Sequence, residues 1–131
     1  MTMQKCRFTI ISAVDGEKNT AIKQGSIDIF EGTVILRYEE EAAKVCITLQ
    51  MGKAHVVRQG DYSLSLPLDQ GKKTEGHLGL GAADGKIAIQ THTVKYVKEG
   101  IVFKLSLRYD LMFSAEERQK MQLNIRAVIK E

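Results

Sequence analysis

Two charged residues, Glu40 and Arg58, carry the strongest chemical signal in the sequence, because the strand pattern turns both of them inward. Each continues an alternating apolar run: Glu40 follows Tyr38 by two positions, and Arg58 follows Val56. Successive side chains of a strand point to opposite faces, so every second residue shares a face. A carboxylate and a guanidinium aimed inward at strand ends would form an ion pair or orient an anionic ligand.

The same parity turns a set of five polar side chains inward near strand ends. They are Glu40, Arg58, Thr91, Thr93 and Tyr109. We predict that this set forms a ligand-binding patch at a barrel mouth, in which Arg58 and Tyr109 anchor a small, partly apolar or anionic molecule. Two alternatives are open at this point. The Glu40–Arg58 pair is structural and plugs the barrel end, or Glu40, Arg58 and Tyr109 form a small acid–base enzyme that catalyses a decarboxylation or an isomerisation. We expect a binding protein in preference to an enzyme.

Three strands must hold the charged pair, and residues 33–58 supply them. Their inward positions are Val34, Leu36, Tyr38, Val45, Ile47, Leu49, Ala54 and Val56. The breaks between the three runs, at residues 40–44 and at Met51-Gly52, have the length of hairpin turns, and Gly52 supplies a positive φ. The segment is therefore predicted to be a three-stranded meander with one buried face.

Alternation of this kind recurs along the chain and predicts strands there too. The further runs are 5–14, 20–30, 62–68, 74–82, 87–91, 101–113 and 119–129. Gly25 predicts a bulge or a bend, and Pro67 a strand end or an edge position. Ala83-Asp84-Gly85 predicts a hairpin turn, and the spacing of Ser114 and Glu117 predicts one capped helical turn.

About ten strands with one apolar face each cannot stay flat, because no helices are available to cover that face. The sheet must curl into a barrel or fold into a sandwich, and the short connections favour the barrel. The sequence thus predicts an all-β protein, an up-and-down meander β-barrel of about 8–10 antiparallel strands. At 131 residues it is expected to form a single domain that covers positions 1–131.

Several short motifs occur in an order and spacing that resemble a known family. They are LRYEEE (36–41), VCITL, VVRQG (56–60), DGKIAIQT (84–91) and LSLRYDL (105–111). Together they resemble the bacterial YwiB-like family, a domain of unknown function, over about residues 5 to 129. The resemblance implies a calycin-like (lipocalin-type) β-barrel with room for an interior cavity. It implies no activity, substrate or catalytic residue.

The composition and the other reactive side chains argue against several function classes. Lysines and arginines are scattered and the net charge is only +3, so nucleic acid is not expected as a partner. No apolar run approaches the ~20 residues of a membrane span. Cys6 and Cys46 take opposite faces, which argues against a disulfide and predicts a reduced, cytoplasmic protein. His55, His77 and His92 share no ligand spacing, so no metal and no cofactor are predicted.

Three further features of the sequence concern its surface. The glycine-rich segment 76–85 is followed by a strand and not by a helix, so we interpret it as bends and a hairpin and not as a phosphate loop. Lys104, Arg108 and Arg126 form an outward stripe if the last two strands pair, and we interpret it as a solvated face. A homodimer remains an alternative function. It would use an exposed strand edge or the outward residues Ile11, Val57 and Val102.

Overall fold

The computed structural model describes residues 3–81 and 83–130, in which the backbone forms ten β-strands and no helix. The strands are β1 (Met3–Val14), β2 (Glu17–Phe30), β3 (Thr33–Glu40), β4 (Ala43–Gln50), β5 (Lys53–Gly60), β6 (Ser63–Asp69), β7 (Lys73–Leu80), β8 (Ala83–Glu99), β9 (Val102–Met112) and β10 (Arg118–Ile129). Consecutive strands pair antiparallel, and β10 pairs with β1. The sheet is therefore a closed meander barrel, which confirms the predicted fold class.

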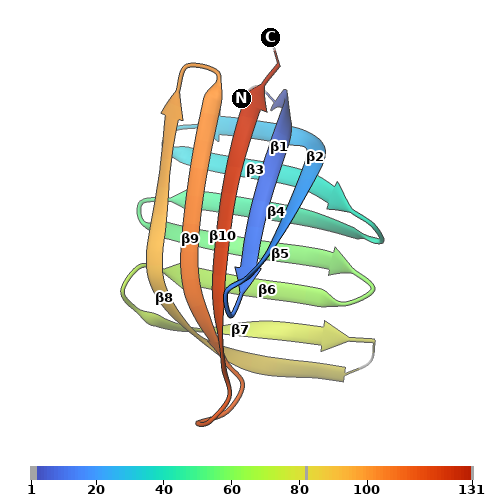
Figure 1. Cartoon of the computed structure of the whole chain (residues 1–131), viewed down its shortest axis with the longest axis vertical. Coiled ribbons are helices and arrows are strands. Elements are labelled where there is room, and N and C mark those ends of the chain that lie inside the picture. Colours follow the sequence, from blue (N-terminus) through green and yellow to red (C-terminus); the bar gives the residue numbers. More distant parts are fainter. Residues whose placement is uncertain (1–2, 82, 131) are drawn as a thin grey trace.

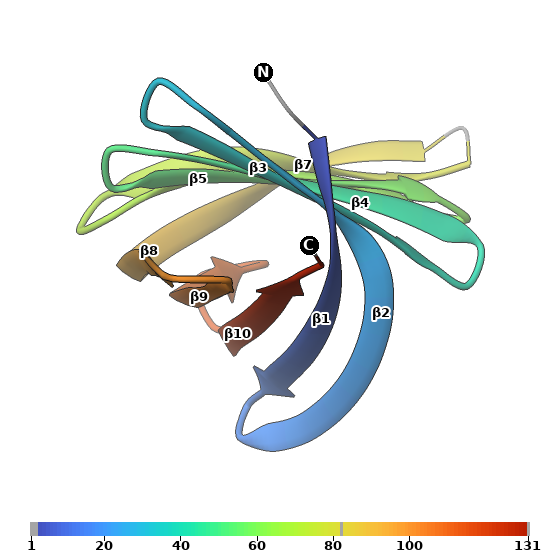
Figure 2. The same cartoon turned by 90° about the horizontal axis from the view of Figure 1, so that it is seen from above.

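The barrel is flattened into two layers whose strands cross. In Figure 1, β9, β10, β1 and the end of β8 run vertically in front of β3 to β7, which run across the picture. Seen from above, β2 bends around one side of the barrel and β8 around the other, so these two strands belong to both layers (Figure 2). Crossed layers of this kind enclose one core between their inner faces. The largest fully buried side chains include Phe8, Ile27, Leu36, Ile47 and Phe103.

The inward positions predicted for residues 33–58 are correct. All eight apolar side chains of that set are buried, because β3, β4 and β5 pair in the register that the parity requires. Val34 pairs with Leu49, and Ile47 pairs with Val56. The tight turn between β4 and β5 has positive φ at Met51 and at Gly52, as the sequence predicts for Gly52.

The predicted bend at Gly25 lies where β2, already paired with β1, begins to pair with β3. The pairing of β2 with β1 runs through this position without a shift, so the feature is a bend and not a bulge. A Cβ atom at Gly25 would overlap the carbonyl oxygen of Arg37 and the ring of Phe8. The Phe8 ring in turn packs against Tyr38, with ring centroids 5.6 Å apart. Glycine at this position is therefore required by packing.

β8 changes direction at a β-bulge centred on His92. Thr91 pairs with Tyr109 and Thr93 pairs with Arg108, which leaves His92 without a partner on β9. An extra residue in one strand reverses the parity beyond it. Val94 is accordingly buried, and Thr93 takes the outer face. The prediction that Thr93 faces inward is wrong for this reason.

The loop between β6 and β7 holds the bulge in place. Its Gln70 Oε1 accepts a hydrogen bond of 2.8 Å from the backbone N–H of Val94. The backbone N–H of Gly71 donates to the carbonyl oxygen of Thr91 at 2.9 Å. The loop is free to reach β8 because β6 and β7 pair only over Ser63–Ser65. Pro67 lies beyond the end of that ladder, as its missing N–H predicts.

Two local predictions are wrong. Residues 83–85 belong to β8, where they pair with residues 78–80 of β7, so the hairpin turn comes earlier, at Gly81 with its φ of 60°. Ser114 Oγ does accept hydrogen bonds from the backbone N–H groups of Glu116 and Glu117, at 3.3 and 3.1 Å. The Phe113 N–H, however, bonds to the Glu117 carbonyl, and the segment forms a bend between β9 and β10 without a helical turn.

Replacing Gly25 with alanine should lower the free energy of unfolding by about 1–3 kcal/mol, because the added methyl group overpacks the bend against Phe8. Urea denaturation followed by circular dichroism measures the change. Gly85→Ala is the matched control, since the nearest atom to a Cβ there is the Leu78 carbonyl oxygen at 3.9 Å. An equal loss in both variants would contradict the packing requirement at Gly25.

Candidate functional site

The structure brings the two predicted charges together, but it also gives Arg58 further partners. Arg58 Nε donates to Glu40 Oε2 at 3.4 Å, and Nη2 donates to Asp61 Oδ1 at 2.9 Å. Nη1 donates to the carbonyl oxygen of Tyr62 at 2.7 Å, and the guanidinium lies 3.7 Å from the centre of the Tyr62 ring. All three guanidinium nitrogens thus have partners within the protein. Arg58 holds the turn that follows β5.

The electrostatics of this pair agree with a structural task. The hydrogen bond from Arg58 holds the pKa of Asp61 below its usual range. Burial alone would lower the pKa of Arg58, but the bonds to Asp61 and Glu40 outweigh it and raise that pKa. The Arg58 side chain is 10% exposed and that of Glu40 39%. Glu40 therefore lies at the rim, in contact with water, while the guanidinium is enclosed.

Two other members of the predicted set, Thr91 and Tyr109, pair with each other on β8 and β9 and are buried. Burial raises the pKa of Tyr109 to about 12. The pKa of Tyr38 is raised by burial first, and then by the charges of Glu40 and Tyr109. Thr91 Oγ1 is buried without a hydrogen-bond partner among the described residues. Thr91 and Tyr109 are therefore interior polar groups, whereas Glu40 lies at the rim.

A second group of charges, which the sequence reasoning missed, surrounds Asp110. This residue has outward parity on β9, yet it is only 6% exposed. Its Oδ2 lies 3.1 Å from Nε2 of His92 and accepts a hydrogen bond of 3.3 Å from Nη1 of Arg118. His92 is the extra residue of the bulge in β8. Bulges often re-aim a side chain next to a functional site.

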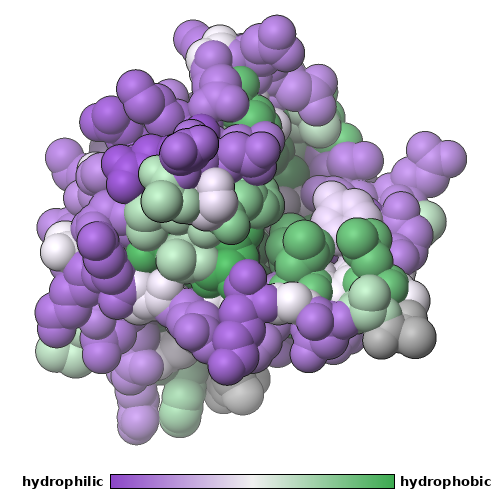
Figure 3. All heavy atoms as spheres, turned by 90° about the horizontal axis from the view of Figure 1, so that it is seen from below, coloured by the Kyte–Doolittle hydropathy of each residue, from purple (hydrophilic) through white to green (hydrophobic). Residues whose placement is uncertain are grey.

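These charges border a cleft of about 520 Å³ at the end of the barrel that carries the β9–β10 loop. We call it the bulge cleft, and it is lined by Ala13, Gly16, His92, Arg108, Tyr109, Asp110, Lys120, Met121 and Gln122. In the described part of the chain, no carboxylate lies within 4.0 Å of the charged groups of Arg108 or Lys120. Viewed from below, this end of the molecule has hydrophobic atoms around a hollow and hydrophilic atoms at the rim (Figure 3).

The β1–β2 turn fixes one wall of the bulge cleft. Asp15 Oδ1 accepts a hydrogen bond of 2.8 Å from the backbone N–H of Lys120, and the Asp15 N–H donates to the Lys120 carbonyl at 2.8 Å. These two bonds tie the turn to the start of β10. The cleft is thus built from three parts of the barrel that the backbone holds together.

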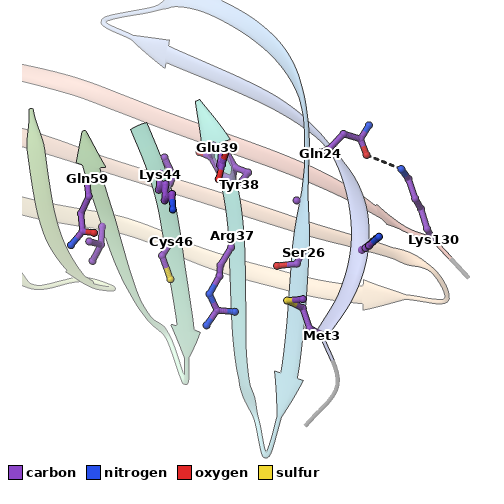
Figure 4. Close-up of a pocket in the computed structure, with 14 residues that line it drawn as sticks. Met3, Gln24, Ser26, Arg37, Tyr38, Glu39, Lys44, Cys46, Gln59 and Lys130 are labelled. Carbon is purple, nitrogen blue, oxygen red and sulfur yellow. Dashed lines mark hydrogen bonds between the residues drawn. The ribbon is translucent and has the colours of Figure 1, made fainter. Parts of the chain in front are cut away.

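A larger groove of about 750 Å³ lies on the outside of β2 to β5, near the two chain ends (Figure 4). Two of its cations have hydrogen-bond partners within the protein. Arg37 donates to Asp28 at 2.6 Å, and Lys130 donates to Gln24 at 2.7 Å. Lys44 stands directly opposite Glu39 across β3 and β4. For an anionic ligand this groove lacks one feature of the bulge cleft, a guanidinium without a carboxylate partner among the described residues, because its own arginine, Arg37, is paired with Asp28.

The cysteines and the metal-ligand residue types add no site of their own. Both cysteines are free, with Cys6 in the core and Cys46 half-buried on the outer side, as their opposite parity predicts. Burial raises the pKa of the Cys6 thiol to about 11, which disfavours a reactive thiolate at neutral pH. Across residues 3–81 and 83–130, no group of three or more His, Cys, Asp or Glu converges as metal ligands would. No helix suited to crossing a membrane occurs in that same part of the chain.

The fold and the cleft together define a small closed antiparallel barrel with a charged cleft at one end. The chain belongs to the DUF1934 family, a domain of unknown function, whose model matches residues 6–125. Its structure is similar to the crystal structure of ywiB protein from Bacillus subtilis, with a TM-score of 0.82 and 14% sequence identity over 98% of this chain and 94% of that chain. The resemblance to the YwiB-like family is thereby confirmed, and at this identity the likeness speaks for the fold alone. The calycin-like assignment stays a prediction. No protein of curated function matches the sequence.

Replacing Arg58 with methionine should lower the free energy of unfolding by about 2–4 kcal/mol, because it removes hydrogen bonds to Asp61, Tyr62 and Glu40 together. Glu40→Gln is the matched variant and should cost about 1 kcal/mol or less, since it weakens one long bond at a partly exposed group. Urea denaturation of both variants measures the difference. Equal losses in the two variants would mean that Arg58 stabilises the fold through its ion pair with Glu40 and not through its bonds to the turn.

Raising the pH should destabilise the protein through Tyr109. Its pKa in the folded state, about 12, exceeds the unfolded value of 10.0, so the fold favours the neutral phenol. This contribution is complete below pH 10 and disappears as the pH rises toward 12. The free energy of unfolding should therefore fall less steeply above pH 10 in Tyr109→Phe than in the wild type. Urea denaturation across that interval tests this, and parallel curves would refute it.

Proposed function

We propose that this protein binds a small anionic molecule in the bulge cleft. The observation that carries the proposal is the pair of cations, Arg108 and Lys120, which line the cleft without a carboxylate partner among the described residues. The predicted function of small-molecule binding is kept, and Tyr109 is kept as a lining residue. The anchoring guanidinium is that of Arg108, because every nitrogen of Arg58 already has a partner.

The charge balance of the cleft supports an anion. Asp110 is the one acidic residue in the lining, and His92 and Arg118 compensate its carboxylate. Arg108 and Lys120 then contribute uncompensated positive charge. A planar guanidinium can donate two parallel hydrogen bonds to a carboxylate or a phosphate group. The volume of about 520 Å³ is typical of small-molecule sites.

Asp110 positions His92 for a part in this binding. With its Nε2 held beside the buried carboxylate at 3.1 Å, His92 has Nδ1 available for a ligand. A neutral imidazole that donates through Nε2 accepts at Nδ1. His92 can thus accept from a hydroxyl group of the ligand. The acid–base alternative at Glu40, Arg58 and Tyr109 stays a prediction that this proposal does not need.

A reducing, cytoplasmic location belongs to the same proposal. Cys6 is enclosed in the core and Cys46 lies on the other side of the wall, so no disulfide between them stabilises the barrel. Free thiols persist most readily where glutathione and thioredoxin keep them reduced.

Titration with inorganic phosphate, followed by amide shifts in two-dimensional NMR spectra, tests the proposed site. We expect the shifts to concentrate at His92, Arg108 and Lys120, and Arg108→Gln to weaken binding about tenfold, or about 1.4 kcal/mol. Arg7→Gln is the matched control, because Arg7 is an exposed arginine of the same layer outside the cleft. Succinate replaces phosphate in a parallel titration.

Binding that Arg7→Gln weakens as much as Arg108→Gln would overturn the assignment, since it would report only the overall charge. So would a failure of both anions to shift the cleft residues of the wild type.

A further inference from the structure

The outer face of one barrel layer is strongly basic. We call it the basic face, and it consists of the outward positions of residues 93–99, β9, β10 and β1. Eight outward cations lie on it: Lys5, Arg7, Lys95, Lys104, Arg108, Arg118, Lys120 and Arg126. Its acidic residues are Glu99 and the buried Asp110. Arg118 pairs with Asp110, and none of the other seven cations lies within 4.0 Å of a carboxylate in the part of the chain that the structure describes.

The centre of the basic face contains a direct conflict of charge. Lys104 on β9 and Arg126 on β10 are cross-strand partners, and both are exposed. Like charges directly opposite each other destabilise a sheet. The next partner of Arg126 is Thr9 on β1, and the next partner of Lys104 is Val97 on β8, so no acidic neighbour in the row relieves the repulsion. An anionic partner would relieve it.

A groove of about 400 Å³ crosses the same rows of side chains. Its lining combines the cations Lys95, Lys104 and Arg126 with apolar side chains, and it contains no acidic residue. Ile11 is 38% exposed and Val97 47%, so both offer apolar surface next to the charges. The four strands stand side by side at the front of Figure 1. The groove is thus apolar at its base and positive around it.

These features favour an acidic peptide over other polyanions. The outward positions of the basic face carry no aromatic side chain, so bases of a single-stranded nucleic acid would find no stacking platform. The apolar surface lies within a groove and does not protrude, which does not suit insertion into a lipid bilayer. A peptide can place one apolar side chain in the groove and carboxylates on either side of it.

We infer that the basic face docks an acidic segment of a partner protein. One aliphatic side chain of the segment fills the groove beside Ile11 and Val97, and flanking carboxylates pair with Lys95, Lys104 and Arg126. Lys104 and Arg126 are directly opposite each other, with Cβ atoms about 5 Å apart, so one carboxylate can bridge their side chains. This site is distinct from the bulge cleft, whose anion binding depends on Arg108 and Lys120, and neither proposal requires the other.

The test is fluorescence anisotropy with a labelled peptide in which one leucine stands between two runs of glutamate. The wild type should bind it with an affinity that falls as salt is added. The double variant Lys104→Glu with Arg126→Glu should bind at least tenfold more weakly, and Val97→Ser should weaken binding without a change of charge. The matched control is Lys44→Glu with Lys73→Glu, which makes the same charge change on the other layer and should bind as the wild type does. Circular dichroism checks that each variant is folded.

Several results would overturn the inference. They are equal binding by the two double variants, no loss when serine replaces the leucine of the peptide, or no binding by the wild type. Binding of an oligonucleotide or of phosphatidylserine vesicles in place of the peptide would assign the face to another partner. Self-association that the Lys104→Glu and Arg126→Glu variant abolishes would make a second copy of the chain the occupant, as in the homodimer alternative. Loss of phosphate binding in Arg108→Gln does not affect the test with the peptide, so the two proposals can fail separately.

Discussion

The pairing of β10 with β1 is the constraint on which the rest of the structure depends. It closes the ladder, gives the described strands neighbours on both sides, and assigns each of them one inner and one outer face. The inner faces then supply a continuous apolar core in which Phe8, Phe103 and Leu107 are almost completely buried. Ten strands can close in two crossed layers only if some of them bend. The two strands that bend are β2 and β8 (Figure 2). In β2 the close packing around Gly25 leaves no room for a side chain, and in β8 the bulge at His92 shifts the register.

The bulge has a chemical consequence as well as a geometric one. It brings the His92 ring to the carboxylate of Asp110, a residue that the alternation of β9 assigns to the outside. Arg58 and Arg108 differ in the partners that the fold gives them. Arg58 donates to a carboxylate on either side and to a backbone carbonyl, whereas Arg108 faces a cleft. Two arginines with the same charge thus differ in whether their guanidinium groups are available to a ligand.

The basic face shows the same principle at the scale of a whole layer. Its cations are spread from Lys5 to Arg126 along the chain, and the net charge of +3 does not reveal them. Antiparallel pairing of β8, β9, β10 and β1 puts them on one surface, because each occupies an outward position of its strand. The repulsion between Lys104 and Arg126 arises only when that register forms. Charge clustering is here a property of the topology.

Much of the fold and part of the site were predictable from the sequence. Alternation between apolar and polar residues determined the strands, their inward faces and the barrel, because the period of two is local and survives in every strand without a bulge. It also brought Glu40 and Arg58 together correctly. Parity fails where one residue is inserted, so Thr93 was assigned to the wrong face. The shift of the apolar positions from Ile87 and Ile89 to Val94 and Tyr96 was the one available signal of the bulge.

The tertiary structure alone decided which charges have partners. Asp61 and the Tyr62 carbonyl occupy Arg58 through a turn whose shape no local pattern specifies. Asp110 is buried where two separate segments meet over it: the bulge, through His92, and the start of β10, through Arg118. The sequence by itself determined what each strand presents to the core. Contacts between distant segments determined where unpaired charge remains, because pairing and burial depend on distances that only the closed barrel establishes.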